Sequence, residues 1–582
     1  MTDKLSGYTP TGRATRRGMG NACHLCRHRK VRCDRAKPAC ETCRLAGVSC
    51  VFTSVPARPR KTVHQAQIQQ LEEELRAQKR SSPVLGYAGP RLSDPGRLDT
   101  AIAAFQWHLP FCDPDPIFDW DDFFRGLFEA SESPCESEPT EPAGSVAVAA
   151  KWPSVQLARC ALDYYKENQL YSVFPAVDVD ELSPVLDTGD LYLDAGSIDV
   201  ASRACLTALT AFVTGLRRDE PIFIAAGADP IAHLRAAFTL LPELTMQDNN
   251  LRALEALMLL TLYIFPLGQP QTGEILLSMA VKILFNLGGN TTRPNQKNQH
   301  LRALFWLCYG IDKENSLRRS RPPLINDADC DLNLPTNYLS EYTDRHFFGD
   351  HTSSQKLLYA SDLRMAILKS RIYRLLYSVD SQRQSEARRL QHIRELDEEL
   401  GDLKAGFPSQ CQPDDFARGR VPDTLFHDLS IRGVCIHLGY YFCLTKIHAA
   451  TSIGDNKRLS PPPSSLELCY QAARSTLLYI SRVQHWIIPG TFWIYGQFLI
   501  TAILALYRHL LIAPDGPYVH DDVQILQDTA NIFARLSATE GGRCFAPFMI
   551  TESFVSKITA LARESVSRVA SVQVGSEGST IS

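Results

Sequence analysis

Six cysteines near the start of the chain have the spacing of a metal-binding cluster. The pattern Cys-x2-Cys-x6-Cys occurs twice, as Cys23, Cys26 and Cys33 and then as Cys40, Cys43 and Cys50. Two tetrahedral zinc ions offer eight ligand positions, and six thiolates fill them if two of the six bridge both metals. The spacing therefore predicts a site for two Zn2+ ions per chain. The six thiolates carry more negative charge than two Zn2+ ions neutralise, and basic neighbours would offset the excess.

Two other interpretations of these cysteines are a disulfide framework and a site for one zinc ion. Residues 1–20 are polar and basic without an apolar core, so no signal peptide is expected, and disulfides need an oxidising compartment. A single zinc ion would leave two cysteines of a regular repeat without a role. The other eleven cysteines are scattered singly and are expected to be reduced, mostly buried side chains, which suits the nucleus or the cytosol.

Positive charge is concentrated around the cysteines. Residues 1–61 carry fourteen Lys and Arg against three Asp and Glu, whereas the whole chain has a net charge of −3. A basic head on an acidic body indicates a polyanionic partner. Six of the basic residues lie in or just after the first repeat: Arg27, Arg29, Lys30, Arg32, Arg35 and Lys37. The matching stretch of the second repeat, residues 44–49, reads RLAGVS and is nearly neutral.

The stretch ACHLCRHRKVRCDRAKPACETCRLAGVSC resembles the fungal zinc binuclear cluster family of transcription regulators. The resemblance covers the six ligand positions, the basic run and the proline of the joining loop, here Pro38. It implies that Cys23 and Cys40 bridge the two metals. It also implies that the first-repeat helix enters the major groove of double-stranded DNA, with dimer spacing setting the separation of the half-sites.

Roles for the basic residues follow from this resemblance. Arg29 and Lys30 match the base-reading positions, because guanine in a CGG-type triplet offers O6 and N7 acceptors to cationic donors. The phosphate contacts would come from Arg27, Arg32, Arg35 and Lys37. His24 and His28 are expected to be exposed rather than to bind metal, because the six thiolates complete the cluster.

The cluster module is expected to span residues 19–51 and to lead into two further segments. Residues 52–62 predict an extended basic linker. Residues 63–80 predict a short coiled coil with Ile68, Leu71 and Leu75 at heptad a, d and a positions, and hence a homodimer. Three apolar positions are few for a coiled coil, so a monomer or a dimer formed elsewhere stays open.

A linker rich in Pro, Ser and Gly is expected to be disordered over residues 81–150. Within it, residues 111–129 interleave Phe and Trp with Asp, a pattern typical of an acidic activation segment that binds coactivators. The same pattern fits a short amphipathic helix that docks on the protein's own following domain. The sequence does not choose between these two interpretations.

Residues 151–563 predict a large all-α regulatory domain, and residues 564–582 a disordered tail. Apolar residues recur at helical spacing in segments such as ALEALMLLTLYIF and RMAILKSRIYRLLYS. LDYYKENQLYSVFPAVD and LFWLCYGIDKENSLRRSRPPLI resemble the fungal-specific middle homology domain of the same family. Residues 492–506, FWIYGQFLITAILAL, are too short for a membrane span, are interrupted by Gly496 and Gln497 and run directly into Arg508 and His509. They predict a buried core helix, so no membrane partner is expected. The expected fold class is mostly α.

No enzyme motif is present, and a closed thiolate cluster has no open position for a substrate. The resemblance implies a nuclear, sequence-specific DNA-binding regulator of RNA polymerase II genes, an activator controlling a metabolic gene cluster, for example for secondary metabolism. Alternatives are a repressor, a metabolite-gated sensor with the same DNA-binding head, and a scaffold that uses zinc only for folding. A small-molecule effector could contact Trp306, Tyr309, Arg318 and Arg321, but ordinary core packing and helix-end salt bridges are the favoured explanation of these residues.

Overall fold

The structure is a computed structural model of the chain. It describes residues 22–52, 150–187, 199–217, 220–246, 250–292, 299–335, 338, 359–407, 412–413, 428–450, 463–489, 492–539, 542 and 545–577. The chain divides into two compact units, Met1–Ala88 and Gly89–Ser582. The expected basic linker beyond Phe52, the coiled coil with Ile68, Leu71 and Leu75, and the acidic-aromatic segment all lie outside the described residues.

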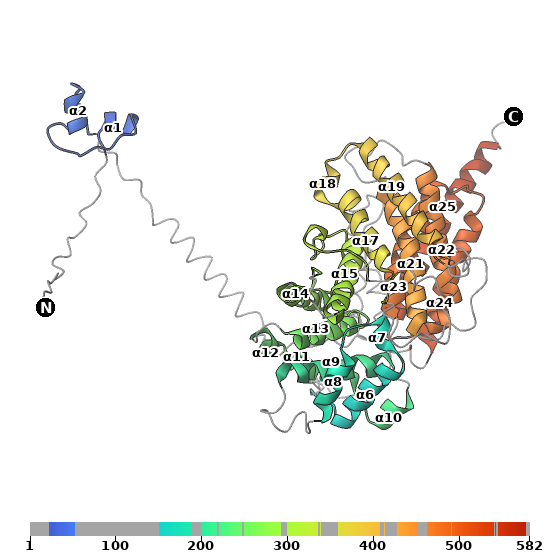
Figure 1. The fold of residues 1–582 in the computed structure, drawn as a ribbon. Coiled ribbons are helices and arrows are strands. Elements are labelled where there is room, and N and C mark those ends of the chain that lie inside the picture. The colour runs from blue at the N-terminus through green and yellow to red at the C-terminus, as the bar shows by residue number, and fades with distance from the viewer. Residues whose placement is uncertain are drawn as a thin grey trace, which may run out of the picture. The chain divides into compact units, whose positions relative to one another are not determined.

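Every regular element among the described residues is a helix, which confirms the predicted fold class (Figure 1). The first unit contains α1 (His24–His28) and α2 (Glu41–Leu45). The second unit contains α6 (Val155–Glu167), α7 (Leu170–Val173), α8 (Val179–Asp187), α9 (Val200–Leu216), α10 (Pro221–Ala225), α11 (Pro230–Thr239), α12 (Leu241–Met246), α13 (Leu251–Ile264), α14 (Pro270–Asn286), α15 (Gln299–Arg319), η1 (Asp327–Asp329), α17 (Leu363–Ile372), η2 (Tyr373–Tyr377), α18 (Val379–Gln382), α19 (Glu386–Ala405), α21 (Asp428–Ala449), α22 (Pro463–Arg482), η5 (Gln484–Trp486), α23 (Phe492–Ile512), α24 (Val519–Ala538) and α25 (Ala546–Glu577).

The two short helices of the first unit are copies of one structure. Each begins directly after an extended cysteine, Cys23 (φ −59°, ψ 161°) for α1 and Cys40 (φ −66°, ψ 154°) for α2. A backbone N–H then closes each turn onto the second cysteine, from Val31 to Cys26 O at 3.0 Å and from Val48 to Cys43 O at 3.2 Å. Helices of five residues are not stable alone in water, so this unit depends on what its cysteines bind.

The core of the second unit is built around α9 and α13. Both helices are apolar all round, as expected of helices that neighbours cover on every side, and nearly all their residues are buried. Side chains at their N-termini satisfy free backbone donors: Asp199 accepts from Ser202 N at 2.9 Å and Asn250 accepts from Ala253 N at 2.7 Å. α9 packs against α6, α11 and α13, and α13 continues the layer to α14.

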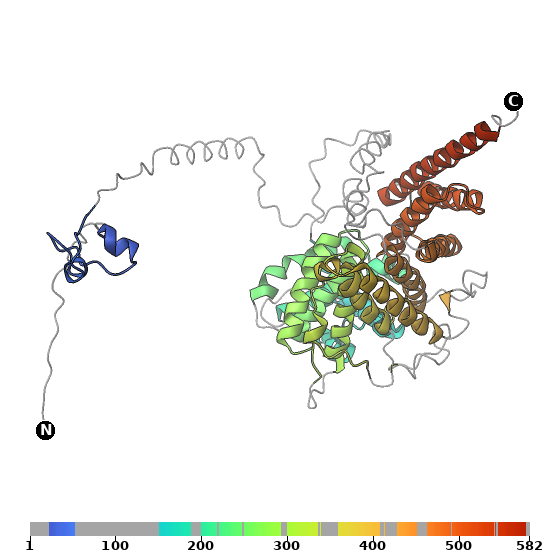
Figure 2. The ribbon, with the colours of Figure 1, turned by 90° about the horizontal axis from the view of Figure 1, so that it is seen from above.

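The remaining helices extend this core toward the C-terminus (Figure 2). α15 packs on α17, α21 packs on α22, α22 on α23, and α24 on α25. α17 continues as one turn of π-helix, Tyr373–Tyr377. Within residues 151–563, the segments whose apolar periodicity predicted helices are helical, so an all-α domain is confirmed for the described part of the chain.

α23 is the one described helix that is long and apolar enough to cross a membrane. Its side chains instead form part of the core, where Leu499, Ile503 and Leu506 are completely buried. The helix packs against α22 and α25. The prediction of a buried core helix over residues 492–506 is confirmed.

The last helix ends later than the expected domain boundary. α25 runs to Glu577, past Arg563, so residues 564–577 are helical rather than the expected disordered tail. The reason is visible at Val566, which is partly buried against the core one helical turn after the fully buried Ala562. Apolar spacing at i and i+4 thus continues beyond the predicted end.

Candidate metal centre and nucleic-acid interface

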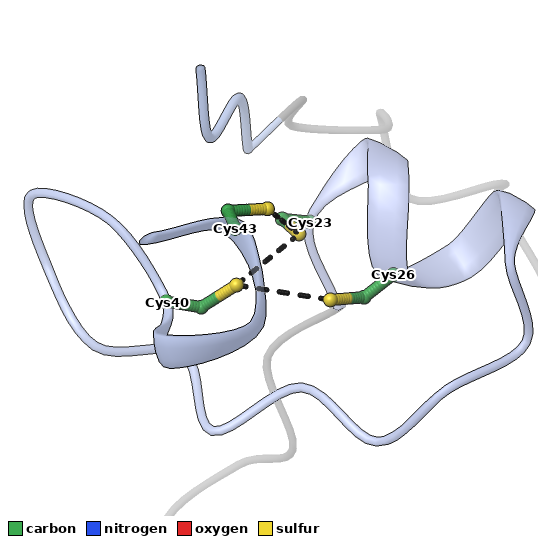
Figure 3. A group of neighbouring side chains, drawn as sticks. All are labelled: Cys23, Cys26, Cys40 and Cys43. Carbon is green, nitrogen blue, oxygen red and sulfur yellow. Dashed lines mark hydrogen bonds between the residues drawn. The ribbon is translucent and has the colours of Figure 1, made fainter. Parts of the chain in front are cut away.

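Four cysteine sulfurs meet in the interior of the first unit (Figure 3). The Sγ atom of Cys23 lies 3.7 Å from that of Cys40 and 3.5 Å from that of Cys43. The Sγ atoms of Cys26 and Cys40 are 3.7 Å apart, and all four cysteines are completely buried. The pairs join residues that are distant in sequence, so the two repeats contact each other through their sulfur atoms.

These separations fit zinc. A tetrahedral zinc ion with Zn–S bonds of about 2.3 Å places its thiolate sulfurs about 3.8 Å apart, close to the 3.5–3.7 Å observed. A disulfide bond requires about 2.0 Å between sulfurs, and the six cysteines are free thiols. The donor set therefore suits a binuclear zinc cluster and not a disulfide framework.

The third cysteine of each repeat joins the same cluster from its edge. The ligand atoms of Cys33, Asp34 and Cys40 lie within 4.8 Å of one another. The Sγ atom of Cys50 accepts a hydrogen bond from Cys40 N at 3.4 Å. Cys33 and Cys50 are half-buried, so the loops that follow α1 and α2 return to the sulfur atoms as the spacing predicted. Cys40 thus lies next to the sulfur atoms of Cys23 and Cys26 in the first repeat and next to that of Cys50 in the second.

The local electrostatics differ between the cysteines. The backbone N–H of Cys26 lowers the pKa of the Cys23 thiol to about 6. Burial raises the pKa of the Cys43 thiol to about 12 and raises the pKa of Cys40 as well. Both Cys23 and Cys40 stand at a helix N-terminus, where the helix dipole favours negative charge. Zinc would displace the protons that the buried thiols hold, so metal binding is coupled to folding and to pH.

The predicted DNA-contacting side chains are all available to a partner. All six are exposed, and they belong to α1 and to the loop that follows it: Arg27, Arg29, Lys30, Arg32, Arg35 and Lys37. The second repeat presents Leu45, which is 79% exposed, and Arg44, which lies 3.9 Å from Glu41. The positive surface of the described module therefore lies on the first repeat.

Two of the basic residues have an unusual backbone. Lys30 (φ 53°) and Arg35 (φ 64°) adopt the left-handed region, which non-glycine residues rarely occupy. Sequence reasoning did not predict this conformation, because nothing in the residue types requires it. His24 and His28 are exposed, as the sequence predicted.

The residues of the helical domain that could contact an effector separate into two pairs. Tyr309 donates a hydrogen bond to Asp327 Oδ1 at 3.0 Å, and Arg321 is exposed. Trp306 and Arg318 line a cavity. Other residues of the same cavity, among them Glu314, Asn315 and Lys369, were missed at the sequence level, although Glu314 and Asn315 stand within the signature segment that includes Trp306 and Arg318.

The sulfur cluster with its basic first repeat and the helical domain each lie in a part of the chain that matches a known protein family. The fungal Zn(2)-Cys(6) binuclear cluster domain matches residues 21–60, and the fungal specific transcription factor domain matches residues 204–405. The chain therefore contains two regions that match the two domains of the Zn2Cys6 family of fungal transcription factors.

Similar proteins are also named as transcription factors or transcriptional regulators. An ABC-transporter-regulating transcription factor from Aspergillus fumigatus is 28% identical over 333 residues, which cover 53% of this chain and 36% of that protein. An uncharacterised transcriptional regulatory protein from Schizosaccharomyces pombe is 22% identical over 576 residues, 88% of this chain and 72% of the relative. An azaphilone cluster-specific transcription factor from Aspergillus niger is 39% identical over 108 residues, 18% of this chain and 22% of the relative. The alignment with the Aspergillus fumigatus protein thus covers little more than a third of that protein's length.

Proposed function

We propose that this protein acts in the nucleus as a sequence-specific regulator of RNA polymerase II genes and has no enzymatic activity. The observation that carries the proposal is the exposed basic surface of the first repeat, held next to a buried cluster of cysteine sulfurs. Zinc bound by all six cysteines would fix α1 and its loop in one conformation, because metal binding supplies folding free energy to so small a module. A cluster closed by thiolates serves structure rather than catalysis.

The first repeat would recognise CGG-type half-sites. Arg29 follows α1 directly and Lys30 begins the loop, so both stand where a helix docked in the major groove meets base edges. Arg27, Arg32, Arg35 and Lys37 would contact phosphates and position the module. The proposed ligands are Cys23 and Cys40 for both metals, with Cys26 and Cys33 completing one site and Cys43 and Cys50 the other.

A homodimer would set the spacing of two half-sites. Ile68, Leu71 and Leu75 would form its short coiled coil, supported by their heptad spacing alone. Sedimentation of the zinc-loaded protein tests this, since replacing the three residues by Ser should shift a dimer to the monomer.

The target would be a metabolic gene cluster, for which the protein would act as an activator. Relatives named as cluster-specific transcription factors support this part of the proposal. Fusing residues 105–130 to an unrelated DNA-binding domain tests activation, because aromatic side chains among acidic ones can bind a coactivator groove. The fusion should drive a reporter, and replacing Trp120, Phe123 and Phe124 by Ala should abolish it. An inert fusion would favour the alternative of a segment that docks on the protein itself.

Genome-wide mapping of bound sites tests the proposed function as a whole. The mapping should return a motif with CGG triplets at one fixed spacing and orientation, upstream of a group of neighbouring metabolic genes. A variant with Lys30→Ala and Arg29→Ala should lose this motif. Equal binding of the wild type and the variant to the same sites would contradict the proposal.

A metabolite-gated sensor is the second candidate, since one cavity in the helical domain favours it. In that case an effector bound to the helical domain would control the same DNA-binding module. Whether the protein activates or represses its genes would then depend on the effector.

A further inference from the structure

The helical domain contains a cavity of about 220 Å³. Helices distant in sequence form its walls, from α9 and α13 to α15, α17 and α23. Most of the wall is apolar, with Phe212, Leu262, Trp306, Leu363, Trp493 and Phe498 among its residues. A largely apolar cavity with a few polar groups is the usual composition of a small-molecule site in a protein.

Three residues of the lining each have one buried side-chain atom without a hydrogen-bond partner. These atoms are Asn315 Nδ2, Arg318 Nε and Ser361 Oγ. The side chains of Asn315 and Arg318 belong to residues that are only 8% and 4% exposed. Buried polar atoms without a partner are rare in native proteins, because such an atom has lost its hydrogen bonds to water without replacing them. Their occurrence in three residues that line one cavity points to a ligand that supplies the missing partner.

The charges around the cavity leave one positive charge uncompensated. Glu314 Oε1 lies 2.6 Å from an Arg318 guanidinium nitrogen, and the other oxygen of Glu314 forms an ion pair with Lys369. One carboxylate thus faces two cations. Asp362, the other acidic residue of the lining, is neutralised by Arg364 at 2.7 Å.

The ionisation of Glu314 agrees with this count of charges. Burial alone would raise the pKa of Glu314, but the Lys369 ammonium and the Arg318 guanidinium outweigh burial and hold the pKa below its ordinary value. Glu314 is therefore ionised near neutral pH, and the group of three carries a net charge of +1.

We infer that this cavity binds a small, mainly apolar ring molecule carrying one carboxylate, whose oxygens accept hydrogen bonds from Asn315 Nδ2 and Arg318 Nε. Two unpartnered N–H donors call for an acceptor, and a net positive charge favours an anionic one. Trp306, Phe212 and Phe498 would cover the ring. An apolar cavity of about 150 Å³ is large enough to bind benzene, so a cavity of about 220 Å³ has room for a larger, two-ring aromatic acid.

Gly310 offers a way to close the cavity without disturbing its walls. Gly310 lies in α15 and lines the cavity, and a Cβ atom added there meets no atom within 4 Å. A leucine at this position would extend into the space that the ligand needs. Gly401 in α19 provides a matched control, because a Cβ atom there also meets nothing within 4 Å and the residue does not line the cavity.

Calorimetric titration of the purified full chain with 2-naphthoate tests the proposal. The wild type and Gly401→Leu should bind the acid saturably with equal affinity, and Gly310→Leu should weaken binding at least tenfold. Circular dichroism of both variants should show unchanged helix content. Absence of saturable binding at millimolar acid, or equal binding by Gly310→Leu, would overturn the proposal.

A second variant tests the role of the donors and guards against a folding defect in Gly310→Leu. Asn315→Leu keeps the side-chain size and removes an N–H donor. It should lower the affinity for 2-naphthoate by about tenfold, the equivalent of one hydrogen bond to a charged group. It should leave the weaker binding of the neutral 2-naphthalenemethanol nearly unchanged. An equal effect on the acid and the alcohol would show that Asn315 does not bind the carboxylate and would contradict the assignment.

Discussion

Lys30 and Gly47 occupy equivalent positions in the two zinc-module repeats and share one backbone conformation. Their φ angles are 53° and 62°, and each residue follows a five-residue helix and one further residue. Each also donates its N–H to the carbonyl three residues back, Arg27 O for Lys30 and Arg44 O for Gly47, both at 3.3 Å. Glycine adopts this conformation easily, whereas for a residue with a side chain the left-handed conformation costs about 1 kcal/mol or more of folding free energy. The strain at Lys30 lies where a base-reading side chain is proposed, as strain at functional sites often does.

Replacing each of these residues should separate stability from DNA binding. Lys30→Gly should make the module about 1 kcal/mol more stable by relieving the left-handed lysine, and should weaken DNA binding. Gly47→Ala should destabilise the module by about the same amount, because a Cβ atom there meets no neighbour and only the backbone strain remains. Chelator competition for zinc measures the stability, and fluorescence anisotropy measures DNA affinity. Unchanged DNA affinity in Lys30→Gly would show that the Lys30 side chain does not contact DNA.

Reading of bases and contact with phosphates should be separable in two lysines. Lys30→Ala should cost about 1–3 kcal/mol on a CGG site and flatten the preference among bases. Lys37→Ala should weaken binding to all sequences alike and reduce the salt dependence by about one counterion. Binding isotherms on CGG and altered duplexes at several salt concentrations measure both effects. A loss of affinity in both variants without a change in base preference would show that Lys30 does not read bases.

The cysteines should differ in how many metals depend on them. Cys40 lies near sulfur atoms or loops of both repeats, and Cys50 lies at the edge of the cluster. Cys40→Ser should therefore lose both zinc ions, whereas Cys50→Ser should weaken one of them first. Elemental analysis after dialysis against a weak chelator gives the number of ions retained. Retention of one zinc ion by Cys40→Ser would argue against a bridging role for Cys40.

The ion-pair group at Glu314 should contribute to the stability of the helical domain in a pH-dependent way. Glu314→Gln leaves Arg318 and Lys369 facing each other almost buried, which should cost about 3 kcal/mol at pH 7. The folded-state pKa of Glu314 is lowered, so its contribution is present above the unfolded value near 4.5 and is lost as pH falls through the folded value. Melting curves of both proteins from pH 7 to pH 3 should converge at the acid end. A constant difference in Tm would show that Glu314 ionisation is not the cause.

Much of the fold follows from local sequence patterns. Cysteine spacing predicted which loops return to the sulfur cluster, and apolar periodicity predicted helices such as α13 and α15, because both signals lie within short stretches. The cavity could not be predicted this way, since its lining comes from residues as distant as Phe174 and Phe498. Tyr309 and Trp306 stand three residues apart in α15, yet only Trp306 lines the cavity. The left-handed backbone of Lys30 could not be predicted either, because it depends on the closed turn of α1 and no residue type there requires it.

DNA binding by the full chain before and after zinc removal tests the central claim most directly. The zinc-loaded protein, with two zinc ions per chain by elemental analysis, should bind a duplex with CGG triplets more tightly than one with the triplets scrambled. Chelation should abolish this preference and re-addition of zinc should restore it, because the metal holds α1 and its basic loop in place. A CGG preference that survives complete zinc removal, or a zinc-loaded protein with no preference for any duplex sequence, would contradict the account.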